Sequence, residues 1–186
     1  MPPMMASSPF SRQMVSDLIA GDNLLISGTL LTGRDAAHKR LVEMIEKGHP
    51  LPVELDGQTL YYMGPSPTPP GRKIGSCGPT TSRRMDAYTP LLLERGMRVM
   101  IGKGERSSSL VEEMQKYRAV YLVTIGGAGA LLASCVKKAE VVAFDDLGPE
   151  AILRLEVENF PATVAYDVHG GDLFQSEIAR YALDRD

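Results

Sequence analysis

Short apolar runs alternate with amphipathic segments along the middle of this 186-residue chain. Strand, helix and strand in this order favour a sheet whose neighbouring strands run parallel, with the helices packed over it. We therefore expect an α/β fold with a mainly parallel sheet core covered by helices. The carboxyl ends of such strands share one edge, where ligands bind. Strands are expected at 24–31, 59–63, 72–77, 97–101, 119–125, 140–144 and 160–168, whereas 151–157 fits either a strand or a short helix.

Size and composition limit the kinds of protein this chain can be. Residues 1–10 are expected to be a disordered leader, and 11–186 a single domain. The net charge of −3 argues against a general nucleic-acid binder. Cys77 and Cys135 stand in no metal-ligand spacing, and no long apolar run indicates a signal peptide or a membrane span. We therefore expect a cytoplasmic protein that holds no metal itself.

The stretch Gly75–Asp86 is the most informative one for function. It is predicted to be a strand end, a sharp turn and a helix that begins at Pro79 and runs to about residue 94. Thr80 and Thr81 then lie in the first turn, and Arg84 shares a helix face with Thr80. A hydroxyl, a guanidinium and a positive helix end together suit a small carboxylate. Taken alone, the stretch is explained slightly better as an ordinary helix start with a solvated arginine.

A second helix start is predicted within residues 32–41. Thr32 followed by Asp35 matches a capping box, and this helix is expected to end near residue 47. Arg34 and His38 then share a face near the positive helix end, which is unfavourable unless an anion lies between them. In the alternative interpretation, Asp35 offsets the charge and His38 simply packs in the core, which for His38 is the stronger interpretation.

A lysine flanked by two glycines follows the strand at 97–101. Lys103 in this position can reach an oxyanion without obstruction by its neighbours, although Gly-Lys-Gly is also common in surface turns. At the shared edge of the sheet we expect Arg34, Thr80, Arg84 and Lys103 to converge. Three cations and a hydroxyl suit a small di-acid, but they contain no nucleophile with its base and no complete cofactor motif.

Five motifs in sequence order resemble the β subunit of the two-subunit, iron–sulfur class I fumarate hydratases, which is equivalent to the C-terminal domain of the single-chain forms. The sister family is the L(+)-tartrate dehydratase β subunit. The resemblance covers about residues 18–174. The motifs are Gly28-Thr-Leu-Leu-Thr-Gly-Arg-Asp-Ala-Ala-His-Lys-Arg40, Gly64-Pro, Gly78-Pro-Thr-Thr-Ser-Arg-Arg-Met-Asp86, Ile101-Gly-Lys-Gly104 and Asp146-Leu-Gly-Pro-Glu-Ala-Ile152.

The resemblance implies the swivelling β/β/α domain fold and reversible hydration of fumarate to L-malate, a step of the tricarboxylic acid cycle. In that family a [4Fe–4S] cluster is bound by three cysteines of the α subunit or N-terminal domain. Neither cysteine of this chain lies in such a motif, so the cluster is expected on a partner α subunit. An α2β2 assembly or a homodimer of β is expected, with a dicarboxylate substrate, no nucleic acid and no membrane.

The resemblance also assigns roles to residues. Thr80 and Lys103 would be catalytic, with Thr80 removing the C3 proton of malate and Lys103 beside it. Asp35 would mainly orient Arg34. The substrate-binding residues would be Thr32, Gly33, Arg34, Asp35, His38, Thr81 and Arg84.

Departures from the family pattern leave other functions open. Arg83 stands where a small residue is more familiar, and residues 105–109 match no family motif. L(+)-tartrate therefore remains an alternative substrate, and a non-catalytic dicarboxylate-binding module is a second alternative. A nucleotide-binding interpretation of Gly126–Gly129 is weak, because the Gly-x-Gly-x-x-Gly pattern is incomplete.

Overall fold

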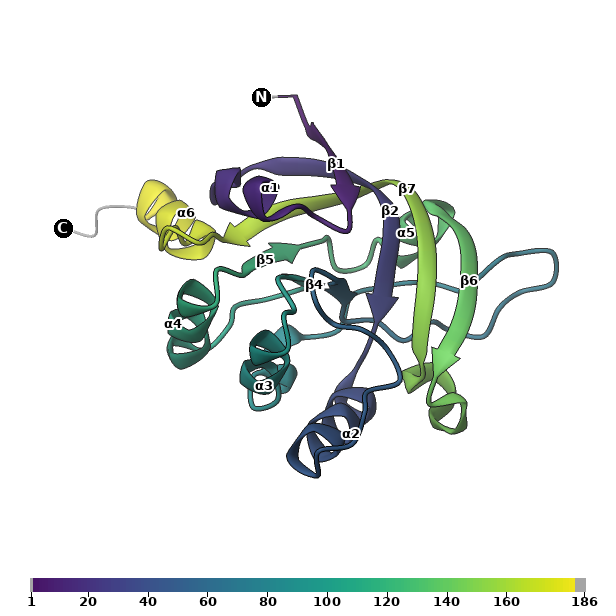
Figure 1. The fold of residues 1–186 in the computed structure, drawn as a ribbon. Coiled ribbons are helices and arrows are strands. Elements are labelled where there is room, and N and C mark those ends of the chain that lie inside the picture. The colour runs from purple at the N-terminus through teal and green to yellow at the C-terminus, as the bar shows by residue number, and fades with distance from the viewer. Residues whose placement is uncertain (1, 183–186) are drawn as a thin grey trace.

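The computed structural model describes residues 2–182, and its centre is a sheet that closes on itself (Figure 1). Its strands are β1 (Met4–Ser8), β2 (Asn23–Thr32), β3 (Thr59–Tyr61), β4 (Val99–Gly102), β5 (Val120–Val123), β6 (Val136–Ala143) and β7 (Ile152–Tyr166). Its helices are α1 (Arg12–Asp17), α2 (Asp35–Glu46), α3 (Thr89–Glu94), α4 (Ser108–Lys116), α5 (Gly129–Ser134) and α6 (Leu173–Tyr181), with 3₁₀ helices η1 (Ser82–Met85) and η2 (Asp145–Glu150).

The long strand β7 closes the sheet into a barrel. Neighbouring strands from β2 through β3 and β4 to β5 pair in parallel, as predicted. β7 then pairs antiparallel with both β2 and β5, which joins the two ends of this arc. The expected α/β fold with a sheet and helices is therefore confirmed, but the sheet closes into a barrel instead of forming a mainly parallel core covered by helices. The sheet closes because residues 151–157 and 160–168, expected as separate elements, lie mostly within one strand. This strand, β7, has 15 residues and reaches both edges.

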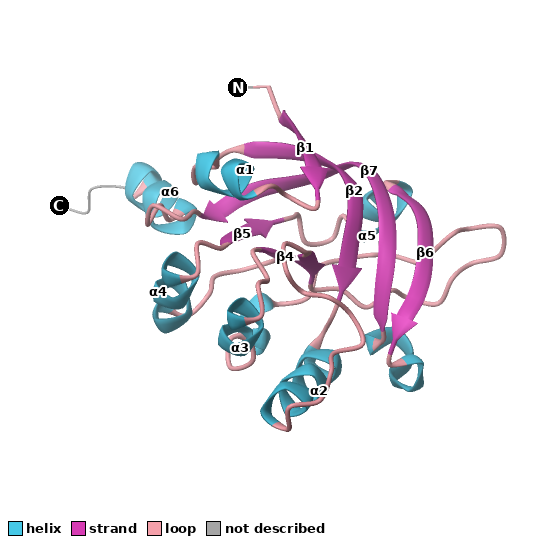
Figure 2. Cartoon of the chain, in the orientation of Figure 1, coloured by secondary structure: helices cyan, strands magenta, loops and turns pink. Residues whose placement is uncertain are grey.

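Helices cover one side of the barrel. α2, α3 and α4 lie in a row beside the parallel strands (Figures 1 and 2). Their apolar faces, including Leu41, Leu93 and Leu110, pack in one buried cluster with outward-facing residues of β3, β4 and β5. None of the helices in the described part of the chain is long and apolar enough to cross a membrane.

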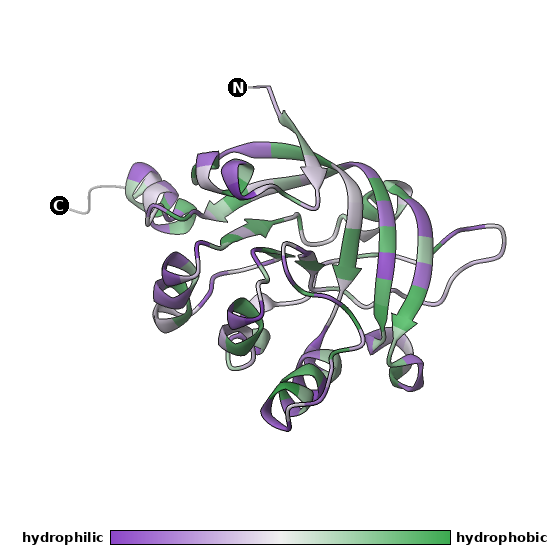
Figure 3. Cartoon of the chain, viewed as in Figure 1, coloured by the Kyte–Doolittle hydropathy of each residue, from purple (hydrophilic) through white to green (hydrophobic). Residues whose placement is uncertain are grey.

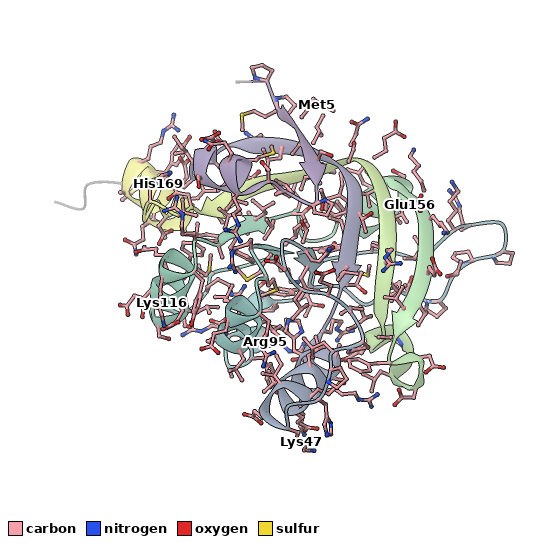
Figure 4. The ribbon with its side chains drawn as sticks, in the orientation of Figure 1. Met5, Lys47, Arg95, Lys116, Glu156 and His169 are labelled. Carbon is pink, nitrogen blue, oxygen red and sulfur yellow. The ribbon has the colours of Figure 1, made fainter. Side chains whose placement is uncertain are left out.

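The period of two along each strand separates this layer from the interior of the barrel. On β4, Val99 and Ile101 pack with the barrel interior, whereas Met100 packs with the helix layer. Hydrophobic residues, green in Figure 3, accordingly lie along the strands and on the inward helix faces. Charged side chains such as Lys47 and Lys116 project outward from the helix ends (Figure 4).

The N-terminal segment differs from the expectation of a disordered leader. Within 1–10, residues 4–8 form β1, which pairs in parallel with β2. Ser8 is buried, and its Oγ donates a hydrogen bond to the carbonyl oxygen of Thr29. Composition concealed this strand, because only two of its five residues are buried.

Candidate active site

Three segments that carry predicted site residues leave the barrel at one edge. Residues at the ends of β2, β3 and β4 are direct neighbours, since Thr32 pairs with Tyr61 and Tyr61 pairs with Ile101. The chain then continues into Gly33, whose N–H donates to the carbonyl oxygen of Tyr61 at 3.1 Å. The carboxyl ends of parallel strands thus bring the predicted residues together, although by different local structures than expected.

Residues 79–82 are inserted between the ends of β3 and β4. The Thr80 N–H donates to the carbonyl oxygen of Tyr62 at 2.7 Å, and the Ser82 N–H donates to that of Lys103 at 3.1 Å. Thr81 forms a parallel bridge with Lys103. Thr80 is half-buried and Thr81 is exposed.

The predicted strand at 72–77 and the helix from Pro79 are both wrong. Only the four residues of η1 are helical here, and α3 begins later, at Thr89. Thr80 and Arg84 therefore do not share a helix face. The physical reason is that the backbone N–H groups of Thr80 and Ser82 already bond to neighbouring strand ends, so this segment is extended.

The start of α2 also differs from the predicted capping box. Thr32 is the last residue of β2, fully buried, and its Oγ1 accepts a hydrogen bond from the Leu153 N–H at 3.0 Å. Asp35 is the first helical residue and caps nothing. Glu150 caps the helix instead, because its Oε2 accepts a hydrogen bond from the Ala36 N–H at 2.8 Å.

Asp35 and Arg84 join the two segments. Arg84 Nε donates to Asp35 Oδ1 at 3.0 Å, and Arg84 Nη2 donates to Oδ2 at 2.8 Å. This bidentate geometry fixes the plane of the guanidinium. The expectation that Asp35 orients Arg34 is therefore wrong, since Asp35 orients Arg84.

Arg34 instead lies beside Glu150. Its Nη2 is 3.5 Å from Glu150 Oε1, and its Nε is buried without a hydrogen-bond partner. The side chain packs against the backbone of Gly64, where a Cβ would come within 2.8 Å of Arg34 Cδ. Sequence reasoning missed Glu150, whose only signal was its place in the last family motif.

His38 lies in the core rather than at an open pocket. Its ring is fully buried, with Nδ1 2.8 Å from the Arg34 carbonyl oxygen, so Nδ1 carries the hydrogen. Burial lowers its pKa to about 4, which makes the imidazole neutral at pH 7. The ring packs edge-on against Tyr62 at 5.2 Å between centroids. His38 thus supports the backbone of Arg34 and adds no second cation.

Lys103 is exposed, and within residues 2–182 its ammonium has no carboxylate within 4.0 Å. Arg84 contacts Asp35 through Nε and Nη2, and its Nη1 takes no part in this ion pair. Arg34 keeps its Nε–H without an acceptor. This edge therefore presents three cationic groups with unused N–H donors beside the segment that carries Thr80.

The donors of this chain do not fit an iron–sulfur cluster. In the described residues no group of three or more His, Cys, Asp or Glu side chains is placed to hold a metal. Burial raises the pKa of the Cys77 thiol to about 11, which disfavours the thiolate that would bind iron. Its Sγ faces the Gly75 carbonyl oxygen instead. Burial also raises the pKa of Cys135.

Comparison with known proteins identifies the family. The model of the fumarase C-terminus matches residues 5–177. The anaerobic class I fumarate hydratase of Escherichia coli K12 is 44% identical over 157 residues, which are 83% of this chain and 29% of that protein. Fumarate hydratase 2 of Leishmania major is 39% identical over 170 residues, 90% of this chain and 30% of that protein.

A third relative is of similar length to this chain. A Methanocaldococcus jannaschii protein, provisionally named L(+)-tartrate dehydratase subunit beta, is 36% identical over 175 residues, which are 89% of this chain and 88% of that protein. By contrast, the chain spans only about 30% of the fumarate hydratases above. The chain belongs to the fumarase C-terminus family, which includes domains of class I fumarate hydratases and separate β-type subunits.

Proposed function

We propose that this chain is the β subunit of an iron–sulfur hydro-lyase that interconverts fumarate and L-malate. The observation that carries the proposal is the backbone pairing of the Thr80 segment with Lys103, next to the Asp35–Arg84 ion pair. It gathers a hydroxyl and three cations at one edge of the barrel. We assign the fold to the swivelling β/β/α class of these hydro-lyases.

In this proposal the two arginines bind the carboxylates of the substrate. The part-exposed guanidinium of Arg34 and the N–H groups of Arg84 outside its contacts with Asp35 are suitable donors, and charge-assisted bonds to a carboxylate are strong. Arg34 packs against Gly64 and Arg84 is held by Asp35, so both side chains have little conformational freedom to lose on binding. Two arginines at separate positions favour a di-acid over a mono-acid.

Thr80 is the base that removes the C3 proton of malate. A free threonine hydroxyl is too weak for this task, so it requires a nearby cation to favour its alkoxide form. Lys103 or a group of the partner subunit is the candidate, and the backbone of Lys103 pairs with that of the next residue, Thr81. The enediolate-like charge that develops on the substrate is stabilised by the same cations.

We propose that the [4Fe–4S] cluster belongs to a separate α subunit. The thiols of this chain do not fit the cluster, and the relatives that are named fumarate hydratases are about three times as long as the matched region. Exposed apolar side chains of Ile125 and Leu131, which line a surface hollow together with the start of β2, provide a surface for such a partner. An α2β2 assembly or a β homodimer is the expected architecture.

L(+)-tartrate is the second candidate substrate. It is favoured by the relative from M. jannaschii, the one of the three whose length this chain nearly covers. Tartrate carries a second hydroxyl, which needs an additional hydrogen-bond partner in the site. Arg83, exposed next to Arg84, is the residue most suited to supply it.

The test is anaerobic co-production with the cluster-bearing α chain of the same genome, with iron supplied. Fumarate absorbance is followed after addition of L-malate, and tartrate consumption is measured in parallel. Malate turnover that is lost in air supports the proposal, and tartrate turnover alone assigns the chain to the second function. Activity of the isolated, iron-free chain, or binding of dicarboxylate without turnover in any complex, would contradict it.

A further inference from the structure

A buried polar network lies behind the site, between the barrel and the helix layer. The hydroxyl of Tyr121 on β5 is 2.7 Å from Ser82 Oγ and 2.9 Å from the carbonyl oxygen of Gly104. A carbonyl can only accept, so the single hydroxyl hydrogen of Tyr121 goes to Gly104, and Ser82 donates to Tyr121. Both side chains are fully buried.

Ser82 also holds the backbone of Lys103 at both of its polar groups. The Ser82 N–H donates to the Lys103 carbonyl oxygen, and the Lys103 N–H donates to Ser82 Oγ, each at 3.1 Å. Ser82 lies directly over Gly102, where any Cβ would overlap its Oγ. The residue that follows Thr80–Thr81 is therefore fixed to the residue that carries the ammonium.

A buried ion pair holds the far end of the same two segments. Arg106 Nε donates to Asp86 Oδ1 at 2.7 Å, and the Ser107 N–H donates to Asp86 Oδ2 at 2.7 Å. Burial opposes the charge of Arg106, but Tyr62 and Asp86 raise its pKa above the ordinary value. Residues 82–86 and 103–107 are thus joined at both ends by buried polar contacts.

Apolar side chains would hold two loops together at a lower desolvation cost than this network. Directional hydrogen bonds, in contrast, fix one register between the two loops. This matters for a catalytic site, because a shift of about 1 Å at a reacting group can reduce turnover by about 10²-fold. We propose that Ser82 and Tyr121 are positioning residues that fix the backbone of Lys103 against the segment that carries Thr80 and Thr81. The inference rests on the proposed function, and it concerns residues that touch no substrate.

The test uses the reconstituted complex with Tyr121→Phe and Ser82→Ala, because changes at Arg106 or Asp86 would leave a buried charge unpaired. Tyr117→Phe is the matched control, since Tyr117 lies at the far end of α4 and its hydroxyl donates to Glu94 Oε1 at 3.1 Å. We expect kcat to fall by about 10-fold or more in both variants. KM stays within about 2-fold, because the arginines are unchanged. Tyr117→Phe leaves both constants unchanged.

A second readout does not depend on turnover. The rate at which an acylating reagent modifies Lys103 is measured by peptide mass spectrometry, with the exposed Lys73 as internal reference. Tyr121→Phe should change the Lys103 rate by about 3-fold or more, because the reactivity of an amine follows its environment. If Tyr121→Phe and Ser82→Ala match Tyr117→Phe in kcat and in Lys103 labelling, the inference is wrong. A wild-type complex without turnover would refute the proposed function, while the labelling comparison would still decide the role of Ser82 and Tyr121.

Discussion

The two segments that carry the candidate site are held in place in different ways. Residues 32–38 run from the end of β2 directly into α2, and Glu150 caps the helix. Residues 78–84 have no such helix, and their backbone is bonded to the ends of β3 and β4. The first segment presents Arg34 from a helix start, and the second presents Thr80 from an extended strand-like insertion.

This difference separates two tasks. A helix start gives a stable platform for a binding charge, because its geometry is fixed by hydrogen bonds within α2 and by the Glu150 cap. In the proposed mechanism the hydroxyl of Thr80 reacts, and the pairing of Thr81 with Lys103 restrains the backbone that carries it. The Asp35–Arg84 ion pair connects the platforms. We therefore expect changes in the first segment to affect binding and stability, and changes at Thr80 to affect the chemical step.

The largest expected effect comes from Thr80→Ala. Loss of the base should lower kcat of the complex by about 10²–10⁴-fold, with little change in stability, because Thr80 contributes to the sheet through its backbone. Steady-state kinetics and thermal unfolding measure both. Thr68→Ala removes an exposed hydroxyl in the proline-rich loop and should match wild type. Retained turnover in Thr80→Ala would remove this residue from the mechanism.

Arg84→Leu should act on binding. Removing one guanidinium from a paired carboxylate site typically costs 2–5 kcal/mol, so KM for malate should rise by about 10²-fold while the fold persists. Arg83→Leu is the matched control at the neighbouring exposed arginine. Equal effects of the two changes on malate would show that Arg84 has no special role.

Lowering the pH should reduce the free energy of unfolding through the buried His38. Its pKa is about 4 in the folded state and about 6.5 when unfolded, so the unfolded chain binds more protons between these values. The free energy of unfolding should therefore fall by on the order of 3 kcal/mol as the pH drops from about 6.5 to 4. Urea unfolding at several pH values measures this slope. His38→Asn should flatten it and the exposed His49→Gln should not, so a slope that survives His38→Asn would assign the acid sensitivity to other groups.

The smallest effect is expected from Asp35→Asn. The partly exposed ion pair with Arg84 is worth about 0–1 kcal/mol, so kcat/KM should fall by only about 2–5-fold. Glu158→Gln, which breaks the exposed pair with Lys137, is the control and should leave the kinetics unchanged. A loss as large as that of Arg84→Leu would mean that Asp35 itself binds substrate.

Local sequence patterns predicted the elements whose structure is local. Apolar runs gave β2, β4 and β5, and the periodicity of residues 35–46 gave α2. The same reasoning wrongly placed a helix after Pro79. A local pattern does not show that the ends of β3 and β4 supply hydrogen bonds to this segment. Closure by β7 was also missed, since pairing with two distant strands leaves no mark in the order of elements.

The predicted site residues fared unevenly for similar reasons. The segments that carry the predicted charged and hydroxyl groups meet at one edge, because topology alone brings strand ends there, and the roles of these groups stay predictions. The resemblance assigned Thr32 and His38 to substrate binding, but both are buried in structural contacts, as the residues alone favoured for His38. Glu150 and Arg106 were missed because their partners are distant in sequence. Glu150 caps α2 at Ala36, and Arg106 pairs with Asp86 in another loop.

The most direct test of a shared dicarboxylate site is titration of the ¹⁵N-labelled chain with succinate, an unreactive di-acid, followed by amide NMR shifts. The backbone signals of Arg34–Asp35 and of Thr80–Arg84 should move along one binding curve, and acetate should bind more weakly. Shifts confined to one segment, or equal responses to acetate and succinate, would contradict a single site built from both strand ends.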